Sequence, residues 1–413
     1  MRGTRPVAVV GSGIVGLSVA YYLLLDGNAV TVIDRDPSGD KASYGNAGGI
    51  AVTEVIPASV PGLAWKVPGW LLDPLGPLAI RPRHALRLLP WLWRFARAGR
   101  PAEVERIASA LSALNGRVYD DLLPMLARTG LSGELNRKGA LTVYESRRAF
   151  DRDTAEWDLK RRHGIETEFL GRTELQAMEP ALGPLAECGV FTPQWSHVND
   201  PRHLVDTLRS WLAAQGVTIL QADVAGIQDG GTAVQLRDGN TVEASSVVVA
   251  AGAWSGHLAR QLGDKVLLES ERGYNTTVPE PGIDLGREII FAERKFVATP
   301  LSCGLRIGGA AEFGGLDAVA EYRRSQSLAK LALLYLPGLK HTGGADWAGH
   351  RPATPDSLPV IGRSDRQQGV VYAFGHGHLG LTQAATTGRL VADLVAGRQP
   401  TIDVAPYSIS RFR

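Results

Sequence analysis

The N-terminal residues alternate between apolar runs and breaks in the order typical of a strand, a helix and a second strand. Residues 7–10 are continuously apolar, as in a parallel strand buried on both faces. Apolar residues then recur at helical spacing over 17–24, and Gly27 ends that helix. Residues 29–33 form a second apolar run, which ends on Asp34. The pattern predicts a βαβ unit.

The break after the first strand, Gly11-Ser12-Gly13-Ile14-Val15-Gly16, has the spacing of a dinucleotide-binding turn. The first glycine permits a tight turn, the second lets a pyrophosphate approach N–H groups at the helix N-terminus, and the third lets helix and strand pack closely. Asp34 stands where a carboxylate accepts the ribose hydroxyls of an adenosine and disfavours a 2′-phosphate. The unit therefore predicts FAD or NAD, and argues against NADP.

The segment after the second strand favours FAD. Residues 42–50 read Ala-Ser-Tyr-Gly-Asn-Ala-Gly-Gly-Ile, which is too rich in glycine and small residues for the crossover helix of a nicotinamide dehydrogenase. Such a loop lets backbone lie against a flat ring, and the alternative is a flexible surface loop.

Two middle segments return to the same parallel sheet. Residues 217–220 are expected to extend the sheet, and Val224 to approach an adenine through its backbone. Residues 247–251 read as a further buried strand, which Gly252 breaks before a helix starts at Trp254.

The C-terminal pattern adds a strand at 370–374, a glycine-rich turn at 375–380 and a helix over 381–395. A helix N-terminus beside such a turn stabilises anionic charge, and a reduced flavin develops negative charge at its N1/O2 edge. Upstream, residues 349–362 hold Arg351 among prolines and small residues. This predicts a rigid loop that aims a guanidinium into a cavity or, alternatively, a surface salt bridge.

The fold class predicted is α/β, with a Rossmann-like FAD-binding domain and an α+β substrate domain. Strands over 269–347 suit a mixed or antiparallel sheet that roofs the flavin, and 103–127 reads as one amphipathic helix. We expect residues 1–53, 199–268 and 345–413 to form the discontinuous FAD-binding domain, and residues 54–198 and 269–344 to form the substrate-binding cap.

The segment 84–101 is basic, aromatic and amphipathic, and two interpretations stay open. In the first, the helix packs on its own protein and buries its larger side chains, namely Leu86, Leu89, Leu92, Trp93 and Phe95. In the second, it lies on an anionic membrane surface, which suits a dehydrogenase that feeds a quinone pool.

Composition and charge exclude several classes of protein. A chain of 413 residues has room for two domains, and a formal net charge of +2 gives no basic field for a nucleic-acid partner. Cys188 and Cys303 lack the spacing of a disulfide framework or a metal site. The sequence shows neither a signal peptide nor an apolar run that would span a membrane. We therefore expect a cytoplasmic protein, free or peripheral on the inner face of the cell membrane.

The segments together resemble the FAD-dependent D-amino-acid oxidase and glycine oxidase family, and within it the bacterial D-amino-acid dehydrogenase small subunits. The likeness is carried by the N-terminal glycine motif, "YGNAGGI" at 44–50, "VVVAAGAWSG" at 247–256, "GHRPATPDSLPVIG" at 349–362 and "GHGHLGLTQ" at 375–383. It covers nearly the whole chain, in order and spacing.

The resemblance implies oxidative deamination of a D-amino acid, including D-proline or hydroxy-D-proline. Arg351 of the "RP" pair grips the substrate carboxylate, and hydride passes from Cα to N5 of non-covalent FAD. The imino acid hydrolyses to a 2-oxo acid, and the electrons go to a quinone or another acceptor. No protein base is required.

Several roles stay open. Tyr274 lies near the active site or packs inward as a strand aromatic. His378 is favoured over His376 as the histidine that faces the isoalloxazine or the substrate, and His197 faces the substrate or lies in a solvated loop. Arg351, Tyr274 and His378 are the candidate catalytic residues.

The expected cofactor contacts are Gly11, Gly13, Ile14, Val15, Gly16, Asp34, Arg35, Ala42, Ser43, Asn46, Ala47, Gly48, Gly49, Ile50, Val224, Ala251, Gly252, Trp254, Gly377, His378, Leu379, Gly380, Leu381 and Thr382.

Three other functions remain open. The first is a glycine- or sarcosine-type amine oxidase that uses O2. The second is the catalytic subunit of a heteromeric opine or hydroxyproline oxidoreductase. The third is an NAD-binding regulatory protein without activity. The sequence decides neither the enantiomer nor between a homo-oligomer and a hetero-oligomer.

Overall fold

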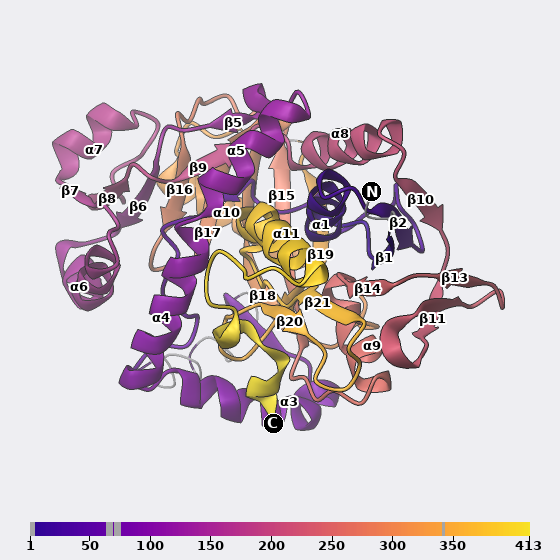
Figure 1. Cartoon of the computed structure of the whole chain (residues 1–413). Coiled ribbons are helices and arrows are strands. Elements are labelled where there is room, and N and C mark those ends of the chain that lie inside the picture. The colour runs from indigo at the N-terminus through magenta and orange to yellow at the C-terminus, as the bar shows by residue number, and fades with distance from the viewer. Residues whose placement is uncertain (1–4, 63–68, 70–75, 341–342) are drawn as a thin grey trace.

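Two large β-sheets organise the chain, and the apolar runs of the sequence build the first of them (Figure 1). The computed structural model describes residues 5–62, 69, 76–340 and 343–413. Among these residues the first sheet has six strands, in the spatial order β10 (Thr218–Gln221), β2 (Ala29–Asp34), β1 (Pro6–Val10), β14 (Ser246–Val249), β21 (Val370–Phe374) and β20 (Val360–Arg363). All neighbours run parallel except β20, which is antiparallel to β21. The predicted extension of the sheet by 217–220 is confirmed.

The two faces of this first sheet carry different covers. One face packs against helices, which are α1 (Ile14–Leu25), α4 (Pro101–Asn115), α5 (Val118–Arg128), α8 (Pro201–Ala214) and α11 (Gly380–Ala396). The other face packs against α9 (Ser255–Gln261) and a small antiparallel sheet of β11 (Val224–Ile227), β12 (Ala233–Leu236) and β13 (Thr241–Glu243). Both faces of the parallel sheet are therefore buried, as its continuous apolar strands require.

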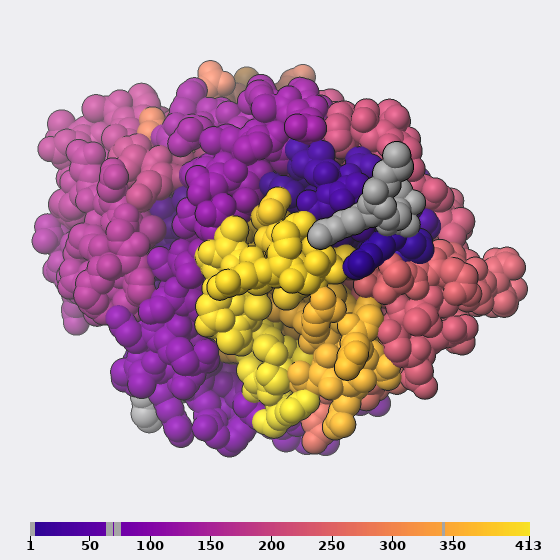
Figure 2. Space-filling view, in the orientation of Figure 1, coloured from indigo at the N-terminus to yellow at the C-terminus, as the bar shows by residue number. Residues whose placement is uncertain are grey.

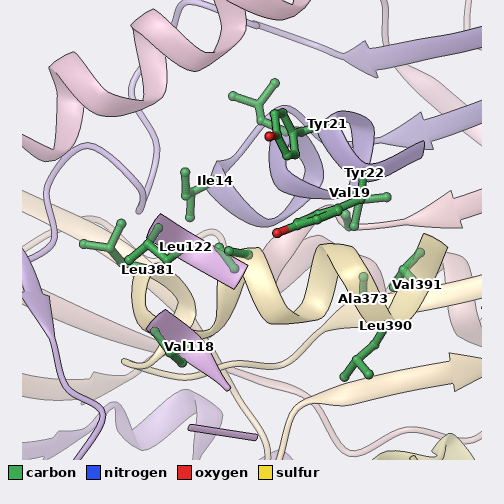
Figure 3. Packing of buried hydrophobic residues seen from close by; sticks show 14 of the residues in the cluster. Ile14, Val19, Tyr21, Tyr22, Val118, Leu122, Ala373, Leu381, Leu390 and Val391 are labelled. Carbon is green, nitrogen blue, oxygen red and sulfur yellow. The ribbon is translucent and has the colours of Figure 1, made fainter. Parts of the chain in front are cut away.

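The largest part of the core lies between α1 and α11. Figure 3 shows residues of this buried cluster, with Tyr21 and Tyr22 on α1, Leu381 and Leu390 on α11, and Leu122 on α5. Residues 103–127 thus form two helices that break at Gly116, where one was predicted. Both pack on α11 and share the core of the nucleotide-binding sheet, although the sequence placed them in the cap.

The second sheet is mixed and stands beside the first. Among the described residues its strands are, in spatial order, β19 (Ala345–Ala353), β15 (Glu269–Val278), β18 (Gly304–Phe313), β17 (Phe296–Leu301), β16 (Glu288–Phe291), β6 (Ala140–Tyr144), β8 (Cys188–Thr192) and β7 (Glu168–Leu170), with β4 (Leu78–Ile80) also paired to β18. The β16–β6 and β18–β4 pairs are parallel, and the other pairs are antiparallel. Because β19 belongs to this sheet, we place the return to the nucleotide-binding domain after Ala353 instead of at residue 345.

The remaining elements surround or connect the two sheets. They are α3 (Pro82–Ala98), α6 (Arg147–Arg162), α7 (Arg172–Met178), α10 (Arg323–Tyr335), a second small sheet of β3 (Gly49–Ile50), β9 (Ser196–Val198) and β5 (Leu135–Asn136), and the 3₁₀ turns Ser132–Glu134, Asp229–Gly231, Gly252–Trp254, Ala405–Tyr407 and Ile409–Phe412. In Figure 2 the C-terminal residues (yellow) fill the space between the violet helices and the orange strands on this face.

Helix α3 confirms the predicted helix but not its predicted buried face. Leu86, Leu89 and Trp93 are 80%, 55% and 56% exposed, whereas Leu88 and Trp91 are buried against β18 and Ala353. The prediction that the first three bury against the protein is wrong, because the helix is rotated so that its Leu88–Trp91 edge faces inward. Within the described residues, no helix combines the length and apolar composition needed to cross a bilayer.

The close approach of α1 and α11 depends on Gly388. A Cβ atom at this position would lie 2.5 Å from the Ser18 carbonyl oxygen of α1. We expect Gly388→Ala to lower the free energy of unfolding by about 1–3 kcal/mol, because backbone must move to admit the methyl group. Urea unfolding followed by circular dichroism measures this. Gly133→Ala is the control, since a Cβ there meets nothing within 4 Å; equal midpoints for both variants would contradict the expectation.

Candidate functional site

The glycine turn after β1 has the geometry that its sequence predicts. Gly11 adopts φ +110°, and its N–H donates to the Ile33 carbonyl at 2.8 Å. A Cβ atom at Gly11 would lie 2.4 Å from the Ala250 oxygen, and one at Gly16 would lie 2.0 Å from the Gly11 oxygen. Both positions therefore require glycine, Gly11 for the tight turn and Gly16 for contact between helix and strand.

The N-terminus of α1 opens beside the glycine-rich loop. Gly13 is the N-cap residue and contributes no side-chain cap, and no acidic residue occupies the first turn. The Ile14 N–H donates to Ser43 Oγ at 2.9 Å, and a Cβ at Gly13 would approach that oxygen to 3.2 Å. Backbone donors, a helix dipole and a serine hydroxyl thus converge on one spot, and this donor set suits a pyrophosphate.

Asp34 ends β2 beside this turn. Its Oδ2 accepts hydrogen bonds from Ser12 N and Ser12 Oγ at 2.7 and 2.9 Å, and its Oδ1 accepts one from Asp36 N at 2.9 Å. The Lys41 ammonium lies 3.9 Å from Oδ2, and burial lowers the pKa of Lys41. Sequence reasoning missed Lys41, whose only signal was its place just before the small-residue loop.

The loop 42–50 is fixed from the second sheet. The Arg306 guanidinium of β18 donates to the carbonyls of Tyr44 and Asn46 at 3.2 and 2.7 Å, and Asn275 Nδ2 of β15 donates to the Gly45 carbonyl at 2.6 Å. The interpretation of this segment as a flexible surface loop is therefore wrong.

A single cavity of about 2680 Å³ joins the predicted segments. Most of the expected cofactor contacts line it: Gly11, Gly13, Ile14, Val15, Asp34, Arg35, Ala42, Ser43, Asn46, Ala47, Gly48, Gly49, Val224, Ala251, Gly252, Trp254, Gly377, His378, Leu379, Gly380 and Leu381. Gly16, Ile50 and Thr382 do not. Gly16 faces the first strand, Ile50 is fully buried, and Thr382 Oγ1 accepts the Ala51 N–H at 2.9 Å. These three support the wall of the cavity from behind.

The two histidines of the C-terminal turn have different surroundings. His376 is 3% exposed, its Nε2 lies 2.9 Å from Thr387 Oγ1, and burial lowers its pKa to about 3. It is therefore neutral at physiological pH. Both histidines line the cavity, and His378 is the exposed one. The preference for His378 over His376 stays a prediction.

Arg351 reaches the cavity from strand β19, where the sequence predicted a loop. Its Nη1 donates to Glu271 Oε1 at 2.7 Å and to the Ala310 carbonyl at 3.3 Å. A Cβ atom at Gly273 would lie 2.4 Å from Arg351 Cζ, so the guanidinium lies directly over that glycine. The alternative for Arg351 was a surface salt bridge; the salt bridge is present, but it lies in the wall of the cavity. Sequence reasoning missed Glu271, because only the β15–β19 register pairs the two.

Tyr274 and His197 are both buried. Tyr274 nevertheless belongs to the lining of the cavity, whereas His197 does not. The Tyr274 side chain is 1% exposed, and its hydroxyl donates to Glu312 at 3.0 Å and accepts from Glu321 N at 3.1 Å. The side chain thus packs inward as a strand aromatic, and because Tyr274 also lines the cavity, its place near the active site stays a prediction. His197 is fully buried in β9, opposite Gly49, and burial lowers its pKa to about 4. It neither lines the cavity nor lies in a solvated loop, so both interpretations of His197 are wrong.

The far wall of the cavity carries an ion pair and a buried acid. Burial raises the pKa of Glu54, but the Lys160 ammonium at 2.6 Å outweighs this and lowers it overall. Glu288 accepts from Trp195 Nε1 at 3.0 Å, and burial raises its pKa to about 8. Glu288 also explains why residue 49 is a glycine, because a Cβ atom there would lie 2.6 Å from the Glu288 carboxylate.

Known proteins are similar to this chain in sequence and in fold. Residues 6–394 match the family described as FAD dependent oxidoreductase. D-amino-acid oxidase of Bradyrhizobium diazoefficiens is 38% identical over 426 aligned residues, which cover 99% of each chain. D-amino acid dehydrogenase 2 of Ralstonia nicotianae is 34% identical, over 98% of this chain and 100% of the relative.

Solved structures of lower identity share the architecture. Glycine oxidase from Geobacillus kaustophilus superposes with a TM-score of 0.73 at 22% identity, over 99% of both chains. L-proline dehydrogenase from P. horikoshii superposes with a TM-score of 0.74 at 19% identity, over 100% of this chain and 98% of the other. At this identity the likeness concerns the fold alone.

Arg306 tests how the loop 42–50 contributes to cofactor binding. Replacing it by methionine leaves the carbonyls of Tyr44 and Asn46 without their charged donor. We expect Arg306→Met to raise the dissociation constant for FAD roughly 10-fold or more, since hydrogen bonds to charged groups contribute about 1.5–3 kcal/mol. Fluorescence titration of the apoprotein with FAD measures this. Exposed Arg323→Met is the control; FAD affinity unchanged in Arg306→Met would show that the loop is held by other means.

Proposed function

Because the chain belongs to the FAD dependent oxidoreductase family, we propose that it oxidises D-amino acids to imino acids, which hydrolyse to 2-oxo acids and ammonia. The observation that carries this proposal is the position of Arg351. Its guanidinium lines the same cavity as the glycine turn of β1 and the loop 42–50, and it comes from the opposite sheet. A carboxylate anchor thus shares one enclosure with a nucleotide cradle.

FAD fits the donor set of the first sheet. The N-terminus of α1 with Ser43 would hold the pyrophosphate, Asp34 the ribose, and the backbone of 45–49 the ring system. Bound FAD supplies a two-electron acceptor for the hydride that leaves the substrate Cα. Neither Cys188 nor Cys303 lines the cavity, so neither is placed to form a thioether link, and we propose non-covalent attachment.

The residues of this chain contribute mainly orientation. Arg351 binds the substrate carboxylate through two parallel hydrogen bonds, which fixes Cα relative to the cofactor. Gly273 and the Ala310 carbonyl hold the guanidinium in place. The N-terminus of α11, at Gly380, lines the cavity, and its dipole would favour negative charge on a group held there.

The names of the curated relatives agree on the D configuration of the substrate but differ on the electron acceptor. The two curated relatives are named for D-amino acids, and one is an oxidase while the other is a dehydrogenase. We propose a D-amino acid as substrate, with D-proline and hydroxy-D-proline among the candidates, and a quinone or another carrier as acceptor. Use of O2 on glycine or sarcosine, and action as one subunit of a heteromeric opine or hydroxyproline oxidoreductase, are the alternatives. Each of these functions is compatible with a homo-oligomer or a hetero-oligomer.

Anaerobic titration of the purified holoenzyme tests the activity. We expect the flavin absorption near 450 nm to bleach with a D-amino acid and to remain with its L enantiomer. Admission of air then distinguishes an oxidase, which re-oxidises at once, from a dehydrogenase. A flavin that stays oxidised with every amino acid, glycine and sarcosine would overturn the proposal.

Arg351→Lys tests the carboxylate anchor. Lysine keeps the charge but loses the paired donors, so we expect kcat/KM for the D-amino acid to fall about 100-fold, mostly through KM. Steady-state assays with the accepted D-amino acid measure this, and Arg323→Lys, on the exposed start of α10, is the control. Unchanged kinetic constants would remove Arg351 from the anchor role.

We further propose that the exposed face of α3 binds an anionic membrane surface. Leu86, Leu89 and Trp93 project from it, residues 81–100 contain six arginines and no acid, and Arg97 lies over the Trp93 ring at 4.7 Å. Apolar side chains flanked by arginines complement an anionic lipid surface. The inner edge of the same helix lines the cavity through Trp91 and Leu92, among others. A lipid-soluble quinone would therefore meet the cavity beside the membrane.

Sedimentation with vesicles tests this surface. We expect the holoenzyme to bind vesicles of phosphatidylglycerol and phosphatidylcholine, and binding to fall roughly 10-fold or more in the triple variant Leu86→Ser, Leu89→Ser, Trp93→Ser. The control is Val319→Ser with Leu334→Ser, which removes exposed apolar groups elsewhere. Absence of wild-type binding at low salt, or equal loss in both variants, would contradict a membrane role for α3.

A further inference from the structure

Arg351 and Glu271 form an ion pair inside the cavity. They stand directly opposite each other in the antiparallel pair of β19 and β15, so their side chains share one face of the sheet. Arg351 Nη1 lies 2.7 Å from Glu271 Oε1, and the two side chains are 27% and 17% exposed. Both line the cavity wall. A cation and an anion therefore face the same cavity side by side.

Arg351 and Glu271 each keep hydrogen-bonding atoms that the ion pair does not use and that a ligand could contact. Arg351 uses Nη1 for Glu271 and for the Ala310 carbonyl, and within the described part of the chain these are its hydrogen bonds. The edge formed by Nε and Nη2 is left for a carboxylate, which pairs with such an edge bidentately. Glu271 contacts Arg351 through Oε1, so its second oxygen is left for a donor.

We propose that Glu271 binds the amino group of the substrate while Arg351 binds its carboxylate, and that Glu271 accepts the ammonium proton. This rests on the amino-acid activity proposed above. An amino acid in water is a zwitterion whose two charges are as close together as those of this pair. Before hydride leaves Cα, the N–H⁺ bond breaks and the proton forms an O–H bond with Glu271. The electron pair left on nitrogen then forms the C=N bond as hydride leaves for the two-electron acceptor that bound FAD would supply. Glu271 is then the proton acceptor that the sequence did not require.

A merely structural role makes a different prediction. If Glu271 only orients Arg351, its loss weakens every ligand that has a carboxylate. If it binds the amino group, its loss weakens only ligands that have an amine. Other titratable groups that line the cavity include Glu269, whose carboxylate lies 2.9 Å from His84 Nε2, and also Tyr274, His350, Asp317, His378 and the arginines Arg81, Arg83 and Arg87.

The test uses two small ligands that the enzyme cannot oxidise. 2-Aminoisobutyrate has no hydrogen on Cα, and isobutyrate is the same carboxylate without the amine. Their dissociation constants are measured by calorimetry on the holoenzyme, wild type and Glu271→Gln. We expect the variant to bind 2-aminoisobutyrate roughly 10- to 100-fold more weakly, as for a lost charge-assisted hydrogen bond, and isobutyrate within about 3-fold of wild type. Glu269→Gln, two residues away on the same face of β15, is the matched control.

Kinetics with an oxidised D-amino acid supply the second readout. In Glu271→Gln only substrate that has already lost its proton reacts, so kcat/KM should rise tenfold per pH unit until the pH reaches the pKa of the substrate amine. The wild-type profile should be flatter in this range. Glu271→Asp keeps the carboxylate, and we expect it to recover part of the 2-aminoisobutyrate affinity, which separates loss of charge from misfolding.

The outcomes distinguish this inference from the activity on which it rests. Equal weakening of both ligands in Glu271→Gln, or a pH profile identical to wild type, would overturn the role of Glu271 while D-amino-acid oxidation by the wild type stands. A wild-type enzyme whose flavin no amino acid reduces would overturn the proposed activity itself.

Discussion

The loop 42–50 is the constraint on which the site depends, because both sheets hold it at once. Ser43 contacts the N-terminus of α1 on the first sheet, while Arg306 and Asn275 reach from the second sheet to the carbonyls of residues 44–46. Thr382 at the start of α11 accepts the N–H of the residue after the loop. Buried backbone carbonyls need partners, so these bonds fix the loop and, through it, the distance between nucleotide cradle and substrate anchor.

The two ends of the cavity handle charge by different means. The nucleotide end offers backbone N–H groups and the dipole of α1, which suit a pyrophosphate without a dense cluster of cations. The substrate end offers full charges, with Arg351 balanced by Glu271 at 2.7 Å. A partly buried guanidinium would be costly alone, and the neighbouring carboxylate offsets that cost until a zwitterion arrives. His376 carries no charge, since burial lowers its pKa and keeps the imidazole neutral.

The sequence predicted the parts whose signals are local. The βαβ unit, the glycine turn and the strand at 370–374 followed from periodicity and from glycine spacing, and the structure confirms them. The predictions that were wrong or missing concern contacts between segments that are distant in the sequence. The pairing of Arg351 with Glu271 arises from a register between strands eighty residues apart. The inward face of α3 is chosen by packing at Leu88 and Trp91, which a stretch apolar on several sides does not reveal.

A crystal structure of the holoenzyme with isobutyrate bound would test the central claim most directly, which is that one cavity joins the FAD cradle of the first sheet to a carboxylate anchor on the second. The account predicts the pyrophosphate at the N-terminus of α1, the ring system against 45–49, and the isobutyrate carboxylate on the Nε–Nη2 edge of Arg351. A carboxylate bound away from Arg351, or a ring system turned away from β15 and β19, would contradict it.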